Sequence, residues 1–92
     1  EQEQTERRER QRQLEIDHKR WRRFQEHAEN WRERERLLVF IAELHRLLQT
    51  EGDTSIEGRP LSEWIDWAED RTHALDPFRN GLKGLFKTIS SD

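Results

Sequence analysis

The first half of the chain spaces its apolar residues at helical intervals within an otherwise polar sequence. No proline or glycine occurs between Glu1 and Thr50, and the helix-favouring residues Glu, Gln, Arg and Leu dominate this stretch. Opposite charges also recur four residues apart, as in Glu3 and Arg7, which stabilises a helix by about 0.2–0.5 kcal/mol per pair. The pattern predicts one helix over residues 1–50. Such a helix would be about 75 Å long, because each residue adds ~1.5 Å.

From Leu14 onward, the apolar residues form a seam with the period of a coiled coil. They are separated by steps of 7, 3, 4, 3 and 7 residues, and Asp17 and Glu35 interrupt them. The seam residues are Leu14, Trp21, Phe24, Ala28, Trp31 and Leu38. This spacing is typical of a helix that pairs with another helix. Beyond Leu37 the apolar stripe becomes wider, so we expect the core of the domain at residues 37–48.

A second helix is expected after a break at residues 51–59. Gly52 suits the end of the first helix, Gly58 suits a turn, and Pro60 suits the first turn of a new helix. This helix should end near Leu75, because a proline disfavours helix in the residue before it. A short connection favours an antiparallel neighbour. We therefore expect the face carrying Trp64, Ile65, Ala68 and Leu75 to pack onto that of Leu37, Ile41, Leu44 and Leu48.

A third, short helix is predicted to start at Asp76 and Pro77, which together form a good start signal. Its apolar face would consist of Leu82, Leu85, Phe86 and Ile89. Lys83 and Lys87 lie beside this face, so an amphipathic membrane anchor is an alternative, although packing against the hairpin is favoured.

These elements predict an all-α fold, with a long N-terminal helix, an antiparallel hairpin and a short C-terminal helix. We expect a charged, coiled-coil-like arm at residues 1–36 and a hairpin with its terminal helix at residues 37–92. Together they would make one domain. The second helix is too short to reach the arm, and the tail from Phe78 to Ile89 would cover only a little more of the first helix. Trp21, Phe24 and Trp31 are then left for a partner, with cover by the chain's own tail as the alternative. Exposed aromatic residues along a heptad seam indicate an interface, formed by self-association or with a partner helix. Its candidate residues are Leu14, Trp21, Phe24, Ala28 and Trp31.

Composition limits the other functions that this chain could have. Its 92 residues suit one small domain, 40% of them are charged, and the net charge is −3. Without cysteine it can form no disulfide or zinc–thiolate site, and its apolar runs are too short to span a bilayer. We expect a cytoplasmic protein. Because the chain lacks methionine and begins within a run of charges, we expect it to be a fragment of a longer protein.

The stretch WIDWAEDRTHALDP provides a resemblance. Its Trp64, Trp67 and Ala68, followed by Leu75-Asp76-Pro77, resemble the C-terminal helical region of a group of uncharacterised bacterial proteins. The upstream stretch HAENWRERERLLVFIAEL also matches, so the resemblance covers roughly residues 20–78. It implies a terminal helical module behind a larger N-terminal region, and it implies no activity.

A basic cluster on the arm offers an alternative function. Lys19, Arg20, Arg22 and Arg23 surround Trp21, and cations beside an aromatic ring can contact phosphates and stack on a base. Residues 1–36 as a whole nearly balance acidic with basic side chains, so the net field is weak. Binding of nucleic acid by an accessory domain is therefore the second hypothesis.

Catalytic and metal-binding patterns are weak. Asp66 and Asp70 share a helix face, but no further ligand or acid–base partner converges on them in the sequence. None of the histidine pairs has the i, i+4 spacing of a helical zinc site. We expect no enzymatic activity, cofactor or metal, and no membrane association.

Overall fold

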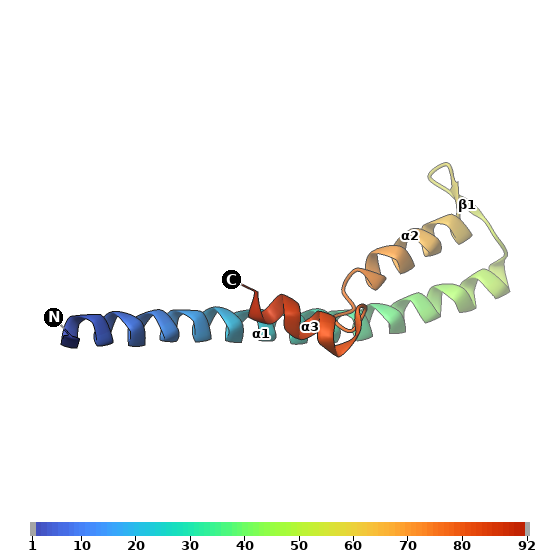
Figure 1. Ribbon diagram of the computed structural model, residues 1–92. Helices are drawn as coiled ribbons and strands as arrows, with labels where there is room; N and C mark the ends of the chain where they lie inside the picture. Colours follow the sequence, from blue (N-terminus) through green and yellow to red (C-terminus); the bar gives the residue numbers. More distant parts are fainter. Residues whose placement is uncertain (1, 92) are drawn as a thin grey trace.

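The computed structural model describes residues 2–91, and one long helix dominates it (Figure 1). Helix α1 runs without interruption from Gln2 to Glu51, and the molecule measures 74 × 24 × 17 Å. Its long dimension agrees with the expected length of a helix of this size. The prediction of a long N-terminal helix is confirmed, although the helical assignment of Glu1 lies outside the described residues.

Helix α1 ends at a glycine in the left-handed conformation, as the sequence indicates. Gly52 has a φ of +81°, and its N–H donates to the carbonyl oxygen of Leu48 at 3.0 Å. A residue with a side chain is strained at such a φ, which is why glycine is favoured at this end of a helix. The chain can therefore turn back sharply towards α1.

The connection between the first two helices contains a small β-hairpin that the sequence analysis missed. Strand β1 is Ser55–Ile56 and strand β2 is Arg59–Pro60, with Ile56 paired to Arg59 in antiparallel register. The two turn residues, Glu57 and Gly58, have φ values of 52° and 77°. Two successive positive φ values characterise the tight turn that matches the twist of a two-residue hairpin. The turn at Gly58 was predicted, whereas the strand pairing around it was not.

Helix α2 spans Leu61–His73, and Pro60 lies immediately before it rather than in its first turn. Asp53 fixes this start, because its two carboxylate oxygens accept from the backbone N–H and the hydroxyl of Ser62 at 2.8 and 2.7 Å. Both hydrogen bonds stabilise the charged form, so the pKa of Asp53 is lowered. The helix ends two residues before the predicted Leu75, whose N–H instead donates to the carbonyl oxygen of Thr72.

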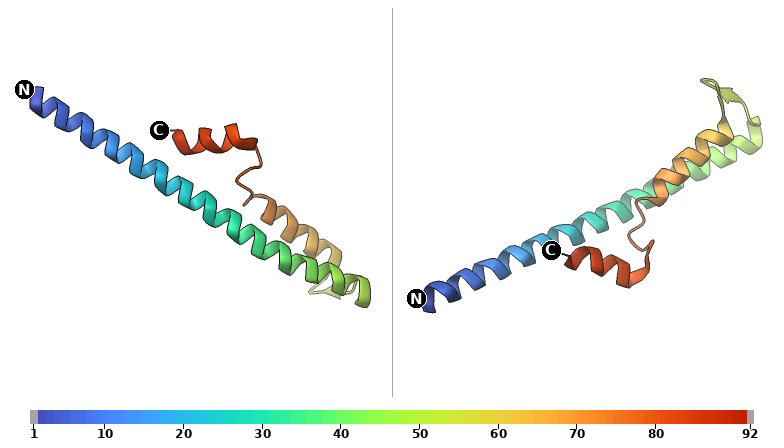
Figure 2. Two further views of the ribbon diagram at one scale, coloured as in Figure 1. Left: turned by 90° about the horizontal axis from the view of Figure 1, so that it is seen from below. Right: turned by 45° about the horizontal axis from the view of Figure 1, so that its top comes forward.

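The core lies between α1 and α2, which runs back along α1 to form a hairpin (Figures 1 and 2). Ile65 is only 1% exposed and Ile41 only 5% exposed. Several predicted core residues around them are half-buried: Leu37, Leu44, Leu48, Trp64, Ala68 and Leu75. A core this thin follows from the composition, because only 30% of the residues are hydrophobic.

Helix α3 spans Gly81–Ser90 and begins later than predicted. The carboxylate of Asp76 accepts from the N–H of Phe78 at 3.0 Å, as a helix N-cap does, but only turns follow at residues 77–80. Gly81 then has a φ of +73°, which an α-helix cannot accommodate in its interior. The expected packing of this helix on the hairpin is also wrong, since α3 lies beside the N-terminal arm of α1 (Figure 2). Its buried residues are Leu85 and Ile89.

Candidate protein interface

The predicted seam residues lie along one side of α1, and they are largely exposed. Trp21, Phe24 and Trp31 are 57%, 43% and 44% exposed, and Leu14 and Ala28 are exposed too. The rings of Trp21 and Phe24 stack with their centroids 5.4 Å apart and their planes 11° from parallel. Helical spacing of three residues brings these rings together. The seam therefore presents an ordered aromatic surface.

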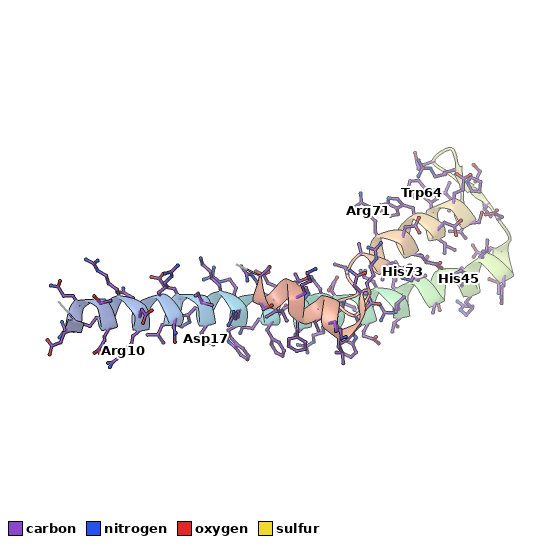
Figure 3. The ribbon with its side chains drawn as sticks, viewed as in Figure 1. Arg10, Asp17, His45, Trp64, Arg71 and His73 are labelled. Carbon is purple, nitrogen blue, oxygen red and sulfur yellow. The ribbon has the colours of Figure 1, made fainter. Side chains whose placement is uncertain are left out.

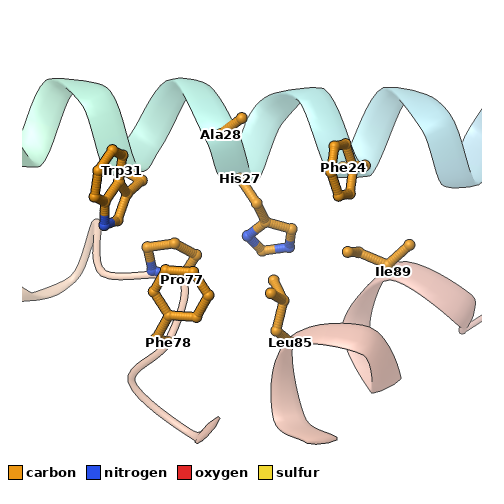
Figure 4. A pocket seen from close by; sticks show the side chains of 8 residues that line it. All are labelled: Phe24, His27, Ala28, Trp31, Pro77, Phe78, Leu85 and Ile89. Carbon is orange, nitrogen blue, oxygen red and sulfur yellow. The ribbon is translucent and has the colours of Figure 1, made fainter. Parts of the chain in front are cut away.

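An apolar groove separates this part of α1 from α3 (Figure 4). Its volume is about 280 Å³, several times the ~30 Å³ that one water molecule occupies in the liquid. The residues that line it come from both helices and from the loop before α3: Phe24, His27, Ala28, Trp31, Pro77, Phe78, Leu85 and Ile89. His27 points from α1 towards Leu85 (Figure 4). Three predicted interface residues, Phe24, Ala28 and Trp31, thus form one wall of the groove.

The groove continues towards the N-terminus of α1. A second hollow of about 230 Å³ is lined by Asp17, Arg20, Trp21, Phe24 and Ile89. It shares Phe24 and Ile89 with the first groove, so the two hollows adjoin. Together they follow the seam from Trp31 to Trp21.

The position of α3, and hence the far wall of the groove, depends on Arg23. Its guanidinium group donates to the carbonyl oxygen of Ile89 at 2.9 Å and also to that of Ser91. These carbonyl groups lie at the C-terminal end of α3, where the helix dipole favours a positive charge. Arg23 therefore holds the end of α3 against the arm.

The basic cluster that suggested nucleic-acid binding is divided by this contact. Lys19, Arg20 and Arg22 are exposed, whereas Arg23 is half-buried and bonded to α3. Lys19 and Arg23 line one hollow with Arg12 and Glu15, whereas Arg20 lies on another side of the helix. Arg20 lines the second hollow, beside Trp21 and Asp17.

The tryptophans of α2 have a structural role at the hairpin. The indole N–H of Trp64 donates to the carbonyl oxygen of Ile56 at 2.9 Å, and the Arg59 guanidinium lies 4.8 Å from the Trp64 ring centre. Trp64 therefore attaches the β-hairpin to α2. Nearer the middle of the helix pair, His45 of α1 contacts the carboxylate of Glu69 (Figure 3 shows His45 beneath α2).

Two further properties concern the part of the chain that the structure describes. Within residues 2–91, no three histidine or acidic side chains gather closely enough to hold a metal ion. Over the same residues, no helix has the length and apolar character needed to cross a membrane. The carboxylates of Asp66 and Asp70 are both on exposed residues of α2.

No protein family matches the chain, and no curated protein or solved structure matches it either. The geometry of the groove and the seam is therefore the basis for inferring a function.

The half of the candidate interface that comes from the C-terminal segment was not predicted from the sequence. Pro77, Phe78, Leu85 and Ile89 face the seam across the groove, and His27 lies between the two walls. The apolar periodicity of residues 82–89 was visible in the sequence. It showed that this helix has an apolar face, but the part of α1 that this face would cover depends on the path of the loop at residues 76–80.

Proposed function

We propose that this chain is a protein-interaction module whose arm docks onto another helix. The binding residues are Leu14, Trp21, Phe24, Ala28 and Trp31, and the binding mode is burial of apolar surface along the heptad seam. The observation that supports this most is the exposure of the stacked Trp21 and Phe24 beside an open apolar groove.

Three large aromatic side chains of the arm are exposed close together. A fully buried large apolar side chain gains about 1.5–3 kcal/mol relative to an exposed one. Since α3 leaves Trp21, Phe24 and Trp31 about half exposed, a partner helix could gain on the order of 1 kcal/mol from each. Contiguous patches of this kind on small proteins commonly mark interaction sites. Both self-association and a different partner fit this reasoning.

Nucleic-acid binding has less support. Arg23 is engaged with α3, and Arg20 lies beside Asp17 in the second hollow, which leaves Lys19 and Arg22 as the remaining pair. Affinity for a polyanion grows with the number of phosphates that are neutralised together, and the acidic side chains of the arm nearly cancel its positive charge. A nucleic-acid-binding function predicts that the chain binds duplex or single-stranded probes and that this binding weakens steeply as the salt concentration rises.

A photo-crosslinking amino acid can test the proposed function. We would replace Trp21 with p-benzoylphenylalanine, and place the same group at Arg22, on the other face of the arm, as the matched control. A protein adduct formed from position 21 and absent from position 22 is expected, and peptide sequencing identifies it as a second copy or another chain. Equal adducts from both positions, or none from position 21, would contradict an interaction through the seam.

A double variant measures the contribution of the aromatic pair. Trp21→Ala combined with Phe24→Ala should weaken the association at least tenfold, while circular dichroism still shows a folded hairpin. Val39→Ala, at an exposed apolar residue of α1 beyond the groove, is the control. Unchanged association in the double variant would argue against the seam.

A further inference from the structure

We propose that the partner of the groove is a helix of another protein whose apolar stripe is flanked by glutamate or aspartate. This inference rests on the proposed function and adds the chemical character of the partner. It depends on the charges that border the groove.

The positions beside the seam carry no acidic residue. In a paired helix, the positions next to the seam on either side face the flanks of the partner. On one side they precede Leu14, Trp21, Ala28 and Glu35, and on the other side they follow Asp17, Phe24 and Trp31. In this chain these residues are Gln13, Arg20, His27, Arg34, His18, Gln25 and Arg32. The borders of the seam are therefore neutral or basic on both sides.

The opposite wall of the groove is apolar, and its segment carries no acidic residue. Helix α3 and the loop before it, residues 77–91, contain Arg79, Lys83 and Lys87 and no acidic residue. All three cations are exposed. Lys83 and Lys87 are each two positions from Leu85, about 200° around α3, so they face away from the groove. The positive charge that a helix in the groove would meet therefore comes from the arm.

Four of the six acidic residues between Leu14 and Arg36 lie elsewhere. Glu15, Glu26, Glu29 and Glu33 are separated by 11, 3 and 4 residues, which places them together on the face of α1 that is opposite the seam. Asp17 and Glu35 are exceptions that lie in the seam itself: Asp17 is beside Arg20 in the second hollow, and Glu35 accepts from the Arg34 guanidinium at 3.1 Å. The arm is therefore close to neutral in total charge, yet basic along the border of the groove.

A second copy of this chain would not satisfy these charges. In a parallel pair, Arg20 would face Gln25 of the second copy, and His27 would face Arg32. In the antiparallel register that matches Trp21 with Phe24, Arg20 would instead face His27 of the second copy. Neither arrangement pairs a flanking cation with an acid. A partner with acidic flanks would form such pairs, and charge complementarity of this kind selects among partners.

The size of the groove indicates how much of the partner is involved. The distance along α1 from Asp17 to Trp31 is about 21 Å, at ~1.5 Å per residue, which corresponds to two heptads. Because isolated helices shorter than ~12–15 residues are marginally stable, a suitable probe has about three heptads.

Two designed peptides test the charge of the partner. Both carry leucine at the seam positions, one has glutamate at every flanking position, and the matched control has lysine there. We expect the glutamate peptide to bind the whole chain at least tenfold more tightly than the lysine peptide at low salt. The difference should shrink in high salt, because exposed charges are screened.

A charge reversal shows whether the flanking residues are responsible. Arg20→Glu combined with Arg32→Glu should reverse the preference, so that the lysine peptide binds more tightly. Arg22→Glu, on the opposite face of α1, should leave the preference unchanged. A structural defect would weaken both peptides equally and could not reverse their order.

Several results would overturn the inference. The unmodified chain could bind the two peptides with equal affinity, bind the lysine peptide more tightly, or bind neither. A homodimer that the glutamate peptide cannot dissociate would also contradict the inference. Binding of duplex DNA as tightly as the glutamate peptide, and equally by the Trp21→Ala/Phe24→Ala variant, would reassign the surface to anions in general. If a seam-specific protein adduct forms at position 21 but the peptides do not differ, the proposed function stands and only the charge assignment fails.

Discussion

Arg23 and Ile89 are 66 positions apart in the chain, yet the guanidinium group of Arg23 donates to the carbonyl oxygen of Ile89 at 2.9 Å. This hydrogen bond joins the arm of α1 to the end of α3, the helix that forms the far wall of the groove. Arg23→Ala should weaken the docking of α3 by about 1.5–3 kcal/mol, the usual contribution of a hydrogen bond to a charged group. Hydrogen exchange of the backbone amides of residues 85–90 would measure the change.

The neighbouring arginine supplies the control for this prediction. Arg22 is exposed and lies on another side of α1, so Arg22→Ala should leave exchange in α3 unchanged. If both variants accelerate exchange equally, the effect comes from the helicity of α1 and not from the contact with α3.

Ile65 should be the most sensitive position of the hairpin core. It is 1% exposed between α1 and α2, and Ile65→Ala should reduce the free energy of unfolding by about 2–5 kcal/mol. Since small domains are marginally stable, we expect α2 to detach from α1 near room temperature. Urea denaturation followed by tryptophan fluorescence would detect this. Val39→Ala removes an exposed apolar side chain from α1 and should shift the midpoint little.

Gly84 lies within α3, where alanine would ordinarily be the better residue. A Cβ atom at this position would lie 2.5 Å from the Cβ of Asn80, a separation that real structures do not show. Gly84→Ala should therefore destabilise α3, although alanine favours helix over glycine by about 1 kcal/mol. Asn80→Gly in the same chain should remove the clash and restore stability. Thermal unfolding of the single and double variants compares the two effects, and a more stable single variant would refute the clash.

Asp53 should make the stability of the interhelical connection depend on pH. Hydrogen bonds from Ser62 lower its pKa below the ordinary value of 3.8. A group with a lowered pKa in the folded state stabilises that state above its unfolded pKa, and the stabilisation is lost as the pH falls through its folded pKa. Acidification below about pH 4 should therefore weaken the start of α2. Asp53→Asn should flatten this part of the pH profile, and an unchanged profile would show that Asp53 contributes nothing to it.

The sequence alone determined the local structure of most of the chain. The absence of proline and glycine from residues 1–50 predicted α1, and Gly52 correctly marked its end. The apolar residues of α2 predicted a core containing Ile65 and Ile41, because helical periodicity fixes which side chains share a face. These features depend on residues close together in sequence. The same local rules do not foresee the strand pairing around Gly58, because two-residue strands have no periodicity.

Only the tertiary structure decided where α3 lies and what the arm presents to a partner. The sequence showed that Leu85 and Ile89 belong to an apolar face, but several turns at residues 76–80 set the direction in which that face points. The contact of Arg23 with Ile89 then joins residues at opposite ends of the chain, which no helical spacing encodes. Seam residues that looked fully unpaired thus became one wall of a groove. Local periodicity can specify the faces of helices, whereas the choice of which faces meet depends on loop geometry and on contacts distant in sequence.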